Sequence, residues 1–186
     1  PLDSTNIVYK AADLIKKQYN IKEGVKIIIE KNIPIAAGMA GGSSNAAAVL
    51  VGLNQLWQLK LSENKLKELG LKLGADVPFC IGGQTALAEN IGEKLTKIDG
   101  LSENIFILVC KPELFVSTKE IYEDIDSKII EKRPNNKLLI QLLKENKIQQ
   151  IADNMYNVLE EVTRERYPVI EEIEKIMMEN DALGSM

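Results

Sequence analysis

A loop rich in glycine and serine separates two apolar segments in the first third of the chain. It lies within IPIAAGMAGGSSNAAAVL, residues 33–50. The apolar residues before the loop are typical of a strand, and the alanine-rich run after it is typical of a helix. Glycine and serine also dominate flexible linkers, but a linker is not expected between adjacent elements of one fold. The order of strand, bare loop and helix therefore favours folds in which a helix begins at a glycine turn.

This loop has the chemistry of an anion-binding site. The first N–H groups of a helix have no partners within the helix, and they lie at the positive end of its dipole. Gly38, Gly41 and Gly42 lack Cβ atoms, so an anion can approach their backbone closely. Ser43 and Ser44 add hydroxyls where the helix is expected to begin. The pattern predicts a phosphate cradle, and a tight structural turn without a ligand is the alternative.

Two common phosphate loops do not fit the pattern. The Walker sequence GxxxxGK[ST] requires a lysine after its second glycine, and no lysine stands there. The dinucleotide sequence GxGxxG is not met either, because Gly38, Gly41 and Gly42 have a different spacing. If the loop binds phosphate, it belongs to another class.

Composition argues against several functions. The chain of 186 residues has a formal net charge of −4 and no basic excess, so nucleic acid is not an expected partner. Its apolar runs are too short to span a bilayer, so a membrane is not expected either. The sequence has no histidine, which removes histidine-dependent triads and HExxH zinc sites. Cys80 and Cys110 have apolar neighbours and are expected to be buried, reduced thiols.

Hydrophobic spacing predicts an α+β chain with two domains. Helices are expected over 7–18, from residue 43 or 44 to about 57 with Trp57 in the core, and after Ser62. Gly74 is expected to end the third helix, and Pro78 to keep residues 75–78 out of helix. Strands are expected over 25–30, 84–89 and 104–111. The pattern is almost entirely helical from Ser117, which places the domains at 1–113 and 114–186.

The stretch PIAAGMAGGSSNAA, residues 34–47, closely resembles the phosphate loop of the GHMP kinase superfamily. Met39 stands where many members have leucine, and Asn45 where many have alanine. Three further stretches resemble one branch of this superfamily: LGADVPF at 73–79, GGQTALAE at 82–89 and IGE at 91–93. The resemblance runs in order over about half of the chain. Members of that branch phosphorylate the 2-hydroxyl of a cytidine-diphosphate-linked methylerythritol in non-mevalonate isoprenoid biosynthesis.

The resemblance implies a fold and a set of ligands. The fold would be the two-lobed GHMP kinase fold, with an ATP-binding lobe like domain 2 of ribosomal protein S5 and a ferredoxin-like second lobe. ATP would be the phosphoryl donor and Mg²⁺ the accompanying metal ion. The protein would be a cytoplasmic monomer or weak dimer of bacterial type, with a plastid as the alternative compartment. The ATP-binding residues would be Pro34, Ile35, Ala36, Ala37, Gly38, Met39, Ala40, Gly41, Gly42, Ser43 and Ser44.

Five side chains acquire specific roles through the resemblance. Asp76 would be the catalytic aspartate and contact the substrate, although its sequence context alone favours a turn aspartate bonded to its own backbone. Ser43 or Ser44 would bind Mg²⁺, or simply cap a helix. Thr118 and Tyr122, one helical turn apart, would contact the substrate; an ordinary amphipathic helix is the alternative.

Two motifs of the superfamily have no counterpart in this chain. These are the lysine-containing segment of the N-terminal lobe and the glycine-rich motif of the C-terminal lobe. We therefore expect both lobes to be truncated and this chain alone to be inactive or nearly so. Two other functions stay open at this stage: another small-molecule GHMP kinase, such as a homoserine or mevalonate-type enzyme, or a non-catalytic nucleotide-binding fragment.

Overall fold

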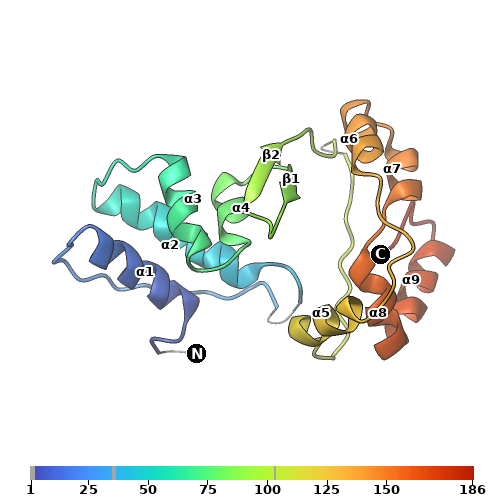
Figure 1. Cartoon of the computed structure of the whole chain (residues 1–186), viewed down its shortest axis with the longest axis horizontal. Helices are drawn as coiled ribbons and strands as arrows, with labels where there is room; N and C mark the ends of the chain where they lie inside the picture. Colours follow the sequence, from blue (N-terminus) through green and yellow to red (C-terminus); the bar gives the residue numbers. More distant parts are fainter. Residues whose placement is uncertain (1–2, 35–36, 103) are drawn as a thin grey trace. The chain divides into compact units, whose positions relative to one another are not determined.

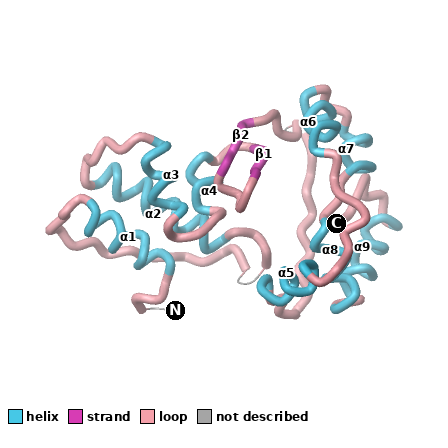
Figure 2. Tube along the Cα trace, in the orientation of Figure 1, coloured by secondary structure: helices cyan, strands magenta, loops and turns pink. Residues whose placement is uncertain are grey.

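The computed structural model describes residues 3–34, 37–102 and 104–186. The chain separates into two compact units, residues 1–98 and 99–186. Figure 1 follows the chain through both units, and Figure 2 shows one hairpin of strands among helices joined by long loops. The assignment of residues 1–113 and 114–186 to two kinase lobes stays a prediction.

Local signals place the helices of the first unit. Within its described residues these are α1 (Ile7–Gln18), α2 (Gly41–Leu56), α3 (Glu63–Leu71) and α4 (Val77–Gly82). Helix α1 has the predicted bounds, because the Asn6 side chain accepts a hydrogen bond of 2.9 Å from the Val8 N–H and caps the first turn. Ser62 caps α3 in the same way, through the Lys65 N–H.

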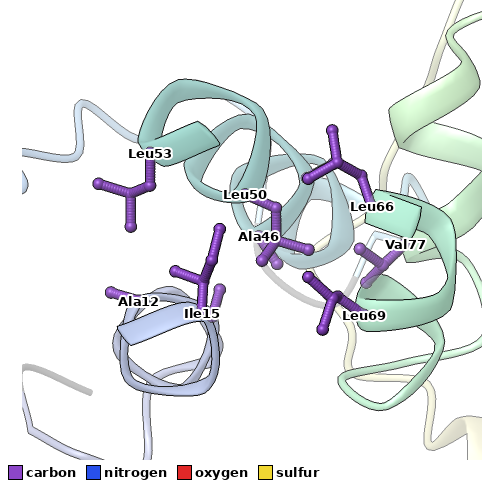
Figure 3. Packing of buried hydrophobic residues seen from close by; sticks show 10 residues of the cluster. Ala12, Ile15, Ala46, Leu50, Leu53, Leu66, Leu69 and Val77 are labelled. Carbon is purple, nitrogen blue, oxygen red and sulfur yellow. The ribbon is translucent and has the colours of Figure 1, made fainter. Parts of the chain in front are cut away.

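The core of this unit lies between α1, α2, α3 and α4. Ile15 and Leu50 are completely buried, and Figure 3 shows Ile15 pointing from α1 towards α2. Leu66 and Leu69 of α3 and Val77 of α4 fill the other side of α2. Trp57, which was predicted to lie in the core, is partly buried and packs against this cluster, whereas Leu56 is 62% exposed. The side chains that the cluster buries on α2 are Ala46, Ala47, Leu50 and Leu53.

A β-hairpin follows α4. Strands β1 (Ala86–Glu89) and β2 (Lys94–Lys97) pair antiparallel, with Ala86 opposite Lys97 and Glu89 opposite Lys94. Strand β1 lies within the predicted strand 84–89, whereas β2 was not predicted. The turn between them has Gly92 at φ 105°, and the Glu93 carboxylate accepts a hydrogen bond of 3.0 Å from the Ile91 N–H. The turn is therefore stabilised by residues of its own sequence, and the hairpin needs no distant segment to form.

Two predicted strands are absent from the described residues. Residues 25–30 and 104–111 have no ladder partner: Asn104 lies in a turn, and the other residues have no regular secondary structure. Most of their apolar side chains are accordingly exposed, such as Ile28 by 81% and Phe106 by 99%, although Ile27 packs against the core. An extended segment becomes a strand only when another segment supplies its hydrogen bonds, and none of the described segments does so here. The fold therefore stays α+β, with a smaller sheet than predicted.

Two predictions about single residues near α4 are wrong. Pro78 was expected to keep residues 75–78 out of helix, yet α4 begins at Val77. Proline is tolerated in a first turn because its missing N–H has no helical acceptor there. Gly74 was expected to end α3 in a left-handed conformation, but its φ is not positive and Lys72 is the C-cap.

The second unit is helical, as predicted. Its described residues form α5 (Thr118–Asp126), α6 (Asn136–Lys144), α7 (Ile148–Asn154), α8 (Val158–Arg166) and α9 (Val169–Glu179). Ile121 and Ile125 of α5 pack against Val162 of α8. Arg166 strengthens this contact by bonding Glu120 at 2.7 Å and Asp124 at 2.8 Å. Among the residues that the structure describes, each helix is too short or too polar to cross a lipid bilayer.

Candidate functional site

The glycine loop turns sharply before it enters α2. Gly38 has φ 66° and Ala40 has φ 48°, so both adopt the left-handed conformation. Glycine adopts this conformation without strain, whereas alanine is held there against its preference. Helix α2 then begins at Gly41, two or three residues earlier than the predicted start at residue 43 or 44. Ile35 and Ala36, two of the predicted ATP-binding residues, lie outside the described residues.

The beginning of α2 presents unbonded backbone N–H groups. The helix has Ala40 as its N-cap, which supplies no side-chain acceptor. The first backbone bond runs from the Ser44 N–H to the Ala40 carbonyl, at 2.8 Å. The N–H groups of Gly41, Gly42 and Ser43 have no acceptor in the described part of the chain. Three donors and the positive end of the helix dipole therefore lie together at this turn.

Gly41 is packed so closely that a side chain has no room. A Cβ atom at Gly41 would lie 2.8 Å from Ile33 Cγ2, and closer still to the Nζ of Lys31. At Gly42, by contrast, a Cβ would meet only Ile7 Cγ2, at 3.9 Å. Sequence reasoning missed Lys31, because its approach to the loop depends on the path of residues that precede the motif.

Asp76 stands at the N-cap position of α4. Its φ and ψ are −83° and −12°, and its side chain makes no capping hydrogen bond. The alternative of a turn aspartate bonded to its own backbone is therefore not seen. Val77, the next residue, is completely buried, so the backbone beside the exposed Asp76 is fixed by the core. Because Val77 shares a core cluster with Ala46 and Ala47, Asp76 is anchored to the N-terminal half of α2.

The charge of Asp76 reaches Cys80, one turn further along α4. Burial raises the pKa of the Cys80 thiol, and the nearby Asp76 carboxylate raises it further. Cys80 is partly buried, close to expectation, but Cys110 is exposed because the segment that carries it is unpaired. Neither thiol forms a disulfide.

The serines at the start of α2 are half-buried. Ser43 and Ser44 offer hydroxyl oxygens, which suit a hard cation such as Mg²⁺. Within the described ranges, no three acidic, histidine or cysteine side chains gather in a metal-binding cluster. A Mg²⁺ ion here would accordingly depend on phosphate oxygens and water for most of its ligands, which is its usual situation beside a nucleotide.

Thr118 and Tyr122 belong to the second unit. Thr118 is the first residue of α5, after the Ser117 N-cap, and Tyr122 follows one turn later with 54% of its surface exposed. An exposed tyrosine leaves its ring available for stacking. Their predicted contact with the substrate stays a prediction.

Comparison with known proteins gives this geometry a context. The profile of the GHMP kinases N terminal domain matches residues 6–84, which include both the loop and Asp76. A 4-diphosphocytidyl-2-C-methyl-D-erythritol kinase of Clostridioides difficile (strain 630) is 62% identical over all 186 residues of this chain. The chain is therefore similar to the GHMP kinases, and residues 6–84 match their N-terminal domain. A kinase of the same name from Caldicellulosiruptor saccharolyticus is 52% identical, also over the whole chain.

The GHMP kinase fold is confirmed by a solved structure. The crystal structure of 4-(cytidine 5'-diphospho)-2C-methyl-D-erythritol kinase matches 96% of this chain with a TM-score of 0.74 and 28% identity. The chain spans 63% of that structure's length, and 63% and 64% of the two relatives above. These relatives share one name, so the comparisons do not favour a homoserine or mevalonate-type GHMP kinase.

Proposed function

We propose that this chain forms part of an ATP-dependent kinase that phosphorylates the 2-hydroxyl of 4-diphosphocytidyl-2-C-methyl-D-erythritol. The observation that carries the proposal is the 62% identity, over the whole chain, to a kinase of that name. Such a step belongs to non-mevalonate isoprenoid biosynthesis. The substrate is a small molecule, and we place the protein in the cytoplasm as a monomer or weak dimer.

ATP would bind with its phosphates at the beginning of α2. The free N–H groups of Gly41, Gly42 and Ser43 supply donors for phosphate oxygens, and the helix dipole favours their negative charge. The space around Gly42 is open, so a phosphate can approach its backbone. Mg²⁺ would be held by the Ser43 or Ser44 hydroxyl together with phosphate oxygens, and would neutralise phosphate charge.

Asp76 would act on the hydroxyl that is phosphorylated. The 2-hydroxyl oxygen forms a bond to the γ-phosphorus, the bond from that phosphorus to the β–γ bridging oxygen breaks, and ADP leaves. Asp76 accepts or orients the hydroxyl proton. Its carboxylate is exposed and makes no capping bond, so it is available for this role. Phosphoryl transfer requires mainly positioning and charge neutralisation, which suits a site with few reactive side chains.

The second unit would contribute substrate contacts. Tyr122 offers an exposed ring for stacking on cytosine, and Thr118 begins the same helix one turn earlier. In this proposal residues 1–113 belong to the ATP-binding lobe and residues 114–186 to the second lobe.

The proposal is tested with the full-length gene product. ATP and Mg²⁺ are supplied with 4-diphosphocytidyl-2-C-methyl-D-erythritol, mevalonate or homoserine in separate reactions, and the gain of one phosphate is followed by mass spectrometry. We expect phosphate transfer to the cytidine-linked alcohol alone. Transfer to mevalonate or homoserine instead would overturn the substrate, and transfer to none of the three would overturn the kinase assignment.

A further inference from the structure

Lys31 brings an ammonium group to the beginning of α2 from outside the glycine motif. It lies in the extended segment before the loop, two residues ahead of Ile33. Its Nζ is the atom nearest to the position that a Cβ of Gly41 would take. Ile33 packs against the same position, with its Cγ2 2.8 Å from it. The Lys31 ammonium group therefore lies close to the backbone of Gly41, the first residue of α2.

This ammonium has no anionic partner in the described part of the chain. Other lysines of the same unit form ion pairs, such as Lys17 with Asp13 at 2.8 Å and Lys67 with Glu63 at 2.6 Å. Lys31 is exposed and makes no such contact, not even with the adjacent Glu30. A lone positive charge is also poorly placed at the positive end of a helix dipole. An anion bound between the Lys31 ammonium group and the beginning of α2 would be attracted by both and would remove this repulsion.

We propose that Lys31 binds the phosphate chain of ATP, together with the N–H groups at the beginning of α2. The inference rests on the proposed function, because it takes ATP to be the anion of this site. In Walker loops a lysine after the second glycine contacts the phosphates. This loop has no lysine there, and residue 31, which precedes the loop, supplies the missing charge. A lysine ammonium is a compact point charge with three donors, well suited to phosphate oxygens.

The test is nucleotide affinity, measured without turnover on the full-length gene product. Lys31→Met removes the charge and keeps an unbranched side chain. Lys26→Met is the matched control, because Lys26 is an exposed lysine of the same extended segment. Calorimetry with the non-hydrolysable analogue AMP-PNP gives the dissociation constant, and adenosine serves as a ligand without phosphates.

We expect Lys31→Met to raise the dissociation constant for AMP-PNP about tenfold or more, the effect of losing a charged hydrogen bond. Lys26→Met leaves it unchanged, adenosine binding is unaffected by either substitution, and Lys31→Arg restores part of the loss. The affinity of Lys31→Met also depends less on salt than that of the unaltered protein.

Failure of the inference is distinguishable from failure of the proposed function. If the unaltered protein does not bind AMP-PNP, the ATP site is wrong and Lys31 has no phosphate to bind. If it binds and Lys31→Met binds equally well, only the role of Lys31 is overturned.

A second measurement needs no substitution. Lysines of the unaltered protein are acetylated with an amine-reactive reagent, and the modified peptides are quantified by mass spectrometry. We expect AMP-PNP to slow the acetylation of Lys31 relative to that of Lys26. Equal acetylation of Lys31 with and without the nucleotide overturns the inference.

Discussion

Glu160 and Glu174 accept hydrogen bonds from the same nitrogen of one arginine. The Nη2 atom of Arg164 lies 3.0 Å from Glu160 Oε1 and also donates to Glu174 Oε2. Both carboxylate side chains are almost buried, with 12% and 11% exposed. Arg164 Nε and Glu174 Oε1 are buried without a partner in the described structure. Two carboxylates thus share one cation between α8 and α9, and one of them is favoured in its neutral form.

This arrangement predicts a titration near neutral pH. Burial, followed by the hydrogen bond and the charge of Glu174, raises the pKa of Glu160 to about 7 from its ordinary value of 4.5. Between pH 4.5 and about 7, Glu160 therefore stays protonated in the folded chain but loses its proton in the unfolded chain. The contribution of Glu160 to the unfolding free energy is greatest below pH 4.5 and is lost as the pH rises through about 7. Carboxyl ¹³C shifts of labelled glutamate report this titration directly.

Glu160→Gln mimics the protonated form and provides the comparison. Glu120 and Asp124 of α5 bond Arg166 of α8, and Lys128, which follows α5, bonds Glu165. On the α9 side, Glu171 interacts with Arg164. We expect Glu160→Gln to gain stability relative to the unaltered chain as the pH rises from 5 to 8, measured by urea unfolding. Glu172→Gln, on the exposed face of α9, should show no such gain. A Glu160 carboxyl that titrates near its ordinary value would contradict the prediction.

Gly42→Val tests the phosphate cradle with little disturbance of the fold. A side chain at Gly42 points into open space, where the nearest atom is 3.9 Å from its Cβ. We expect normal thermal unfolding but a dissociation constant for ATP about tenfold higher or more, because the branched side chain occupies the space of a phosphate. Gly52→Val, at an exposed site of the same helix with nothing within 4 Å, is the control and should bind ATP normally. Unchanged ATP affinity in Gly42→Val would count against the cradle.

Gly70 has the opposite surroundings, and its substitution tests how α4 is held. A Cβ at Gly70 would lie 2.8 Å from Val77 Cγ1 and 3.0 Å from Ile81 Cδ1, so α4 must move to accept it. We expect Gly70→Ala to lower the unfolding free energy by about 1–3 kcal/mol, the usual effect of overpacking a core. Gly52→Ala should instead raise it by about 0.5–1 kcal/mol, because alanine is the better helix former.

Both glycine-to-alanine variants are compared by urea unfolding under the same conditions. Because Val77 is the first residue of α4 and directly follows Asp76, Gly70→Ala is also expected to disturb the position of Asp76. Equal stability of the two variants would show that α3 and α4 are less closely packed than the structure indicates.

Helices α1 and α3 were predictable from sequence because their signals are local. Asn6 and Ser62 cap helices through N–H groups only two or three residues away. The apolar spacing that buries Ile15 and Leu66 is likewise contained within each helix. The glycine motif identified the position of the loop, but α2 begins at Gly41 because the left-handed turn at Ala40 ends one residue before it. Such a backbone turn leaves no mark in the pattern of residue types.

The parts that were mispredicted depend on distant partners. The predicted strands 25–30 and 104–111 have the composition of strands, yet a ladder requires a second segment, and the described residues supply none. Cys110 was expected to be buried for the same reason, and it is exposed along with its neighbours. Lys31 was missed because only the path of the chain before the loop brings its ammonium to Gly41.

Asp76→Asn in the full-length gene product separates a chemical role from a structural one. The substitution keeps the size of the side chain and removes its capacity to accept a proton. General-base assistance typically contributes about 100- to 10,000-fold, so we expect kcat to fall by that much. ATP affinity should remain unchanged, since the cradle lies at α2, and thermal unfolding should remain normal because the Asp76 side chain is exposed and makes no capping bond.

The thiol of Cys80 reports whether the Asp76→Asn substitution alters only the charge. Burial and the Asp76 carboxylate raise the pKa of Cys80, and the thiolate is the reactive form. Removing the carboxylate lowers that pKa, so alkylation of Cys80 at pH 8 should become moderately faster, while the exposed Cys110 serves as the reference in the same molecule. Faster Cys80 alkylation with near-normal kcat would show that Asp76 is charged but has no part in the reaction. Greatly faster alkylation with a lowered thermal transition would show instead that α4 has opened, and that the aspartate is structural.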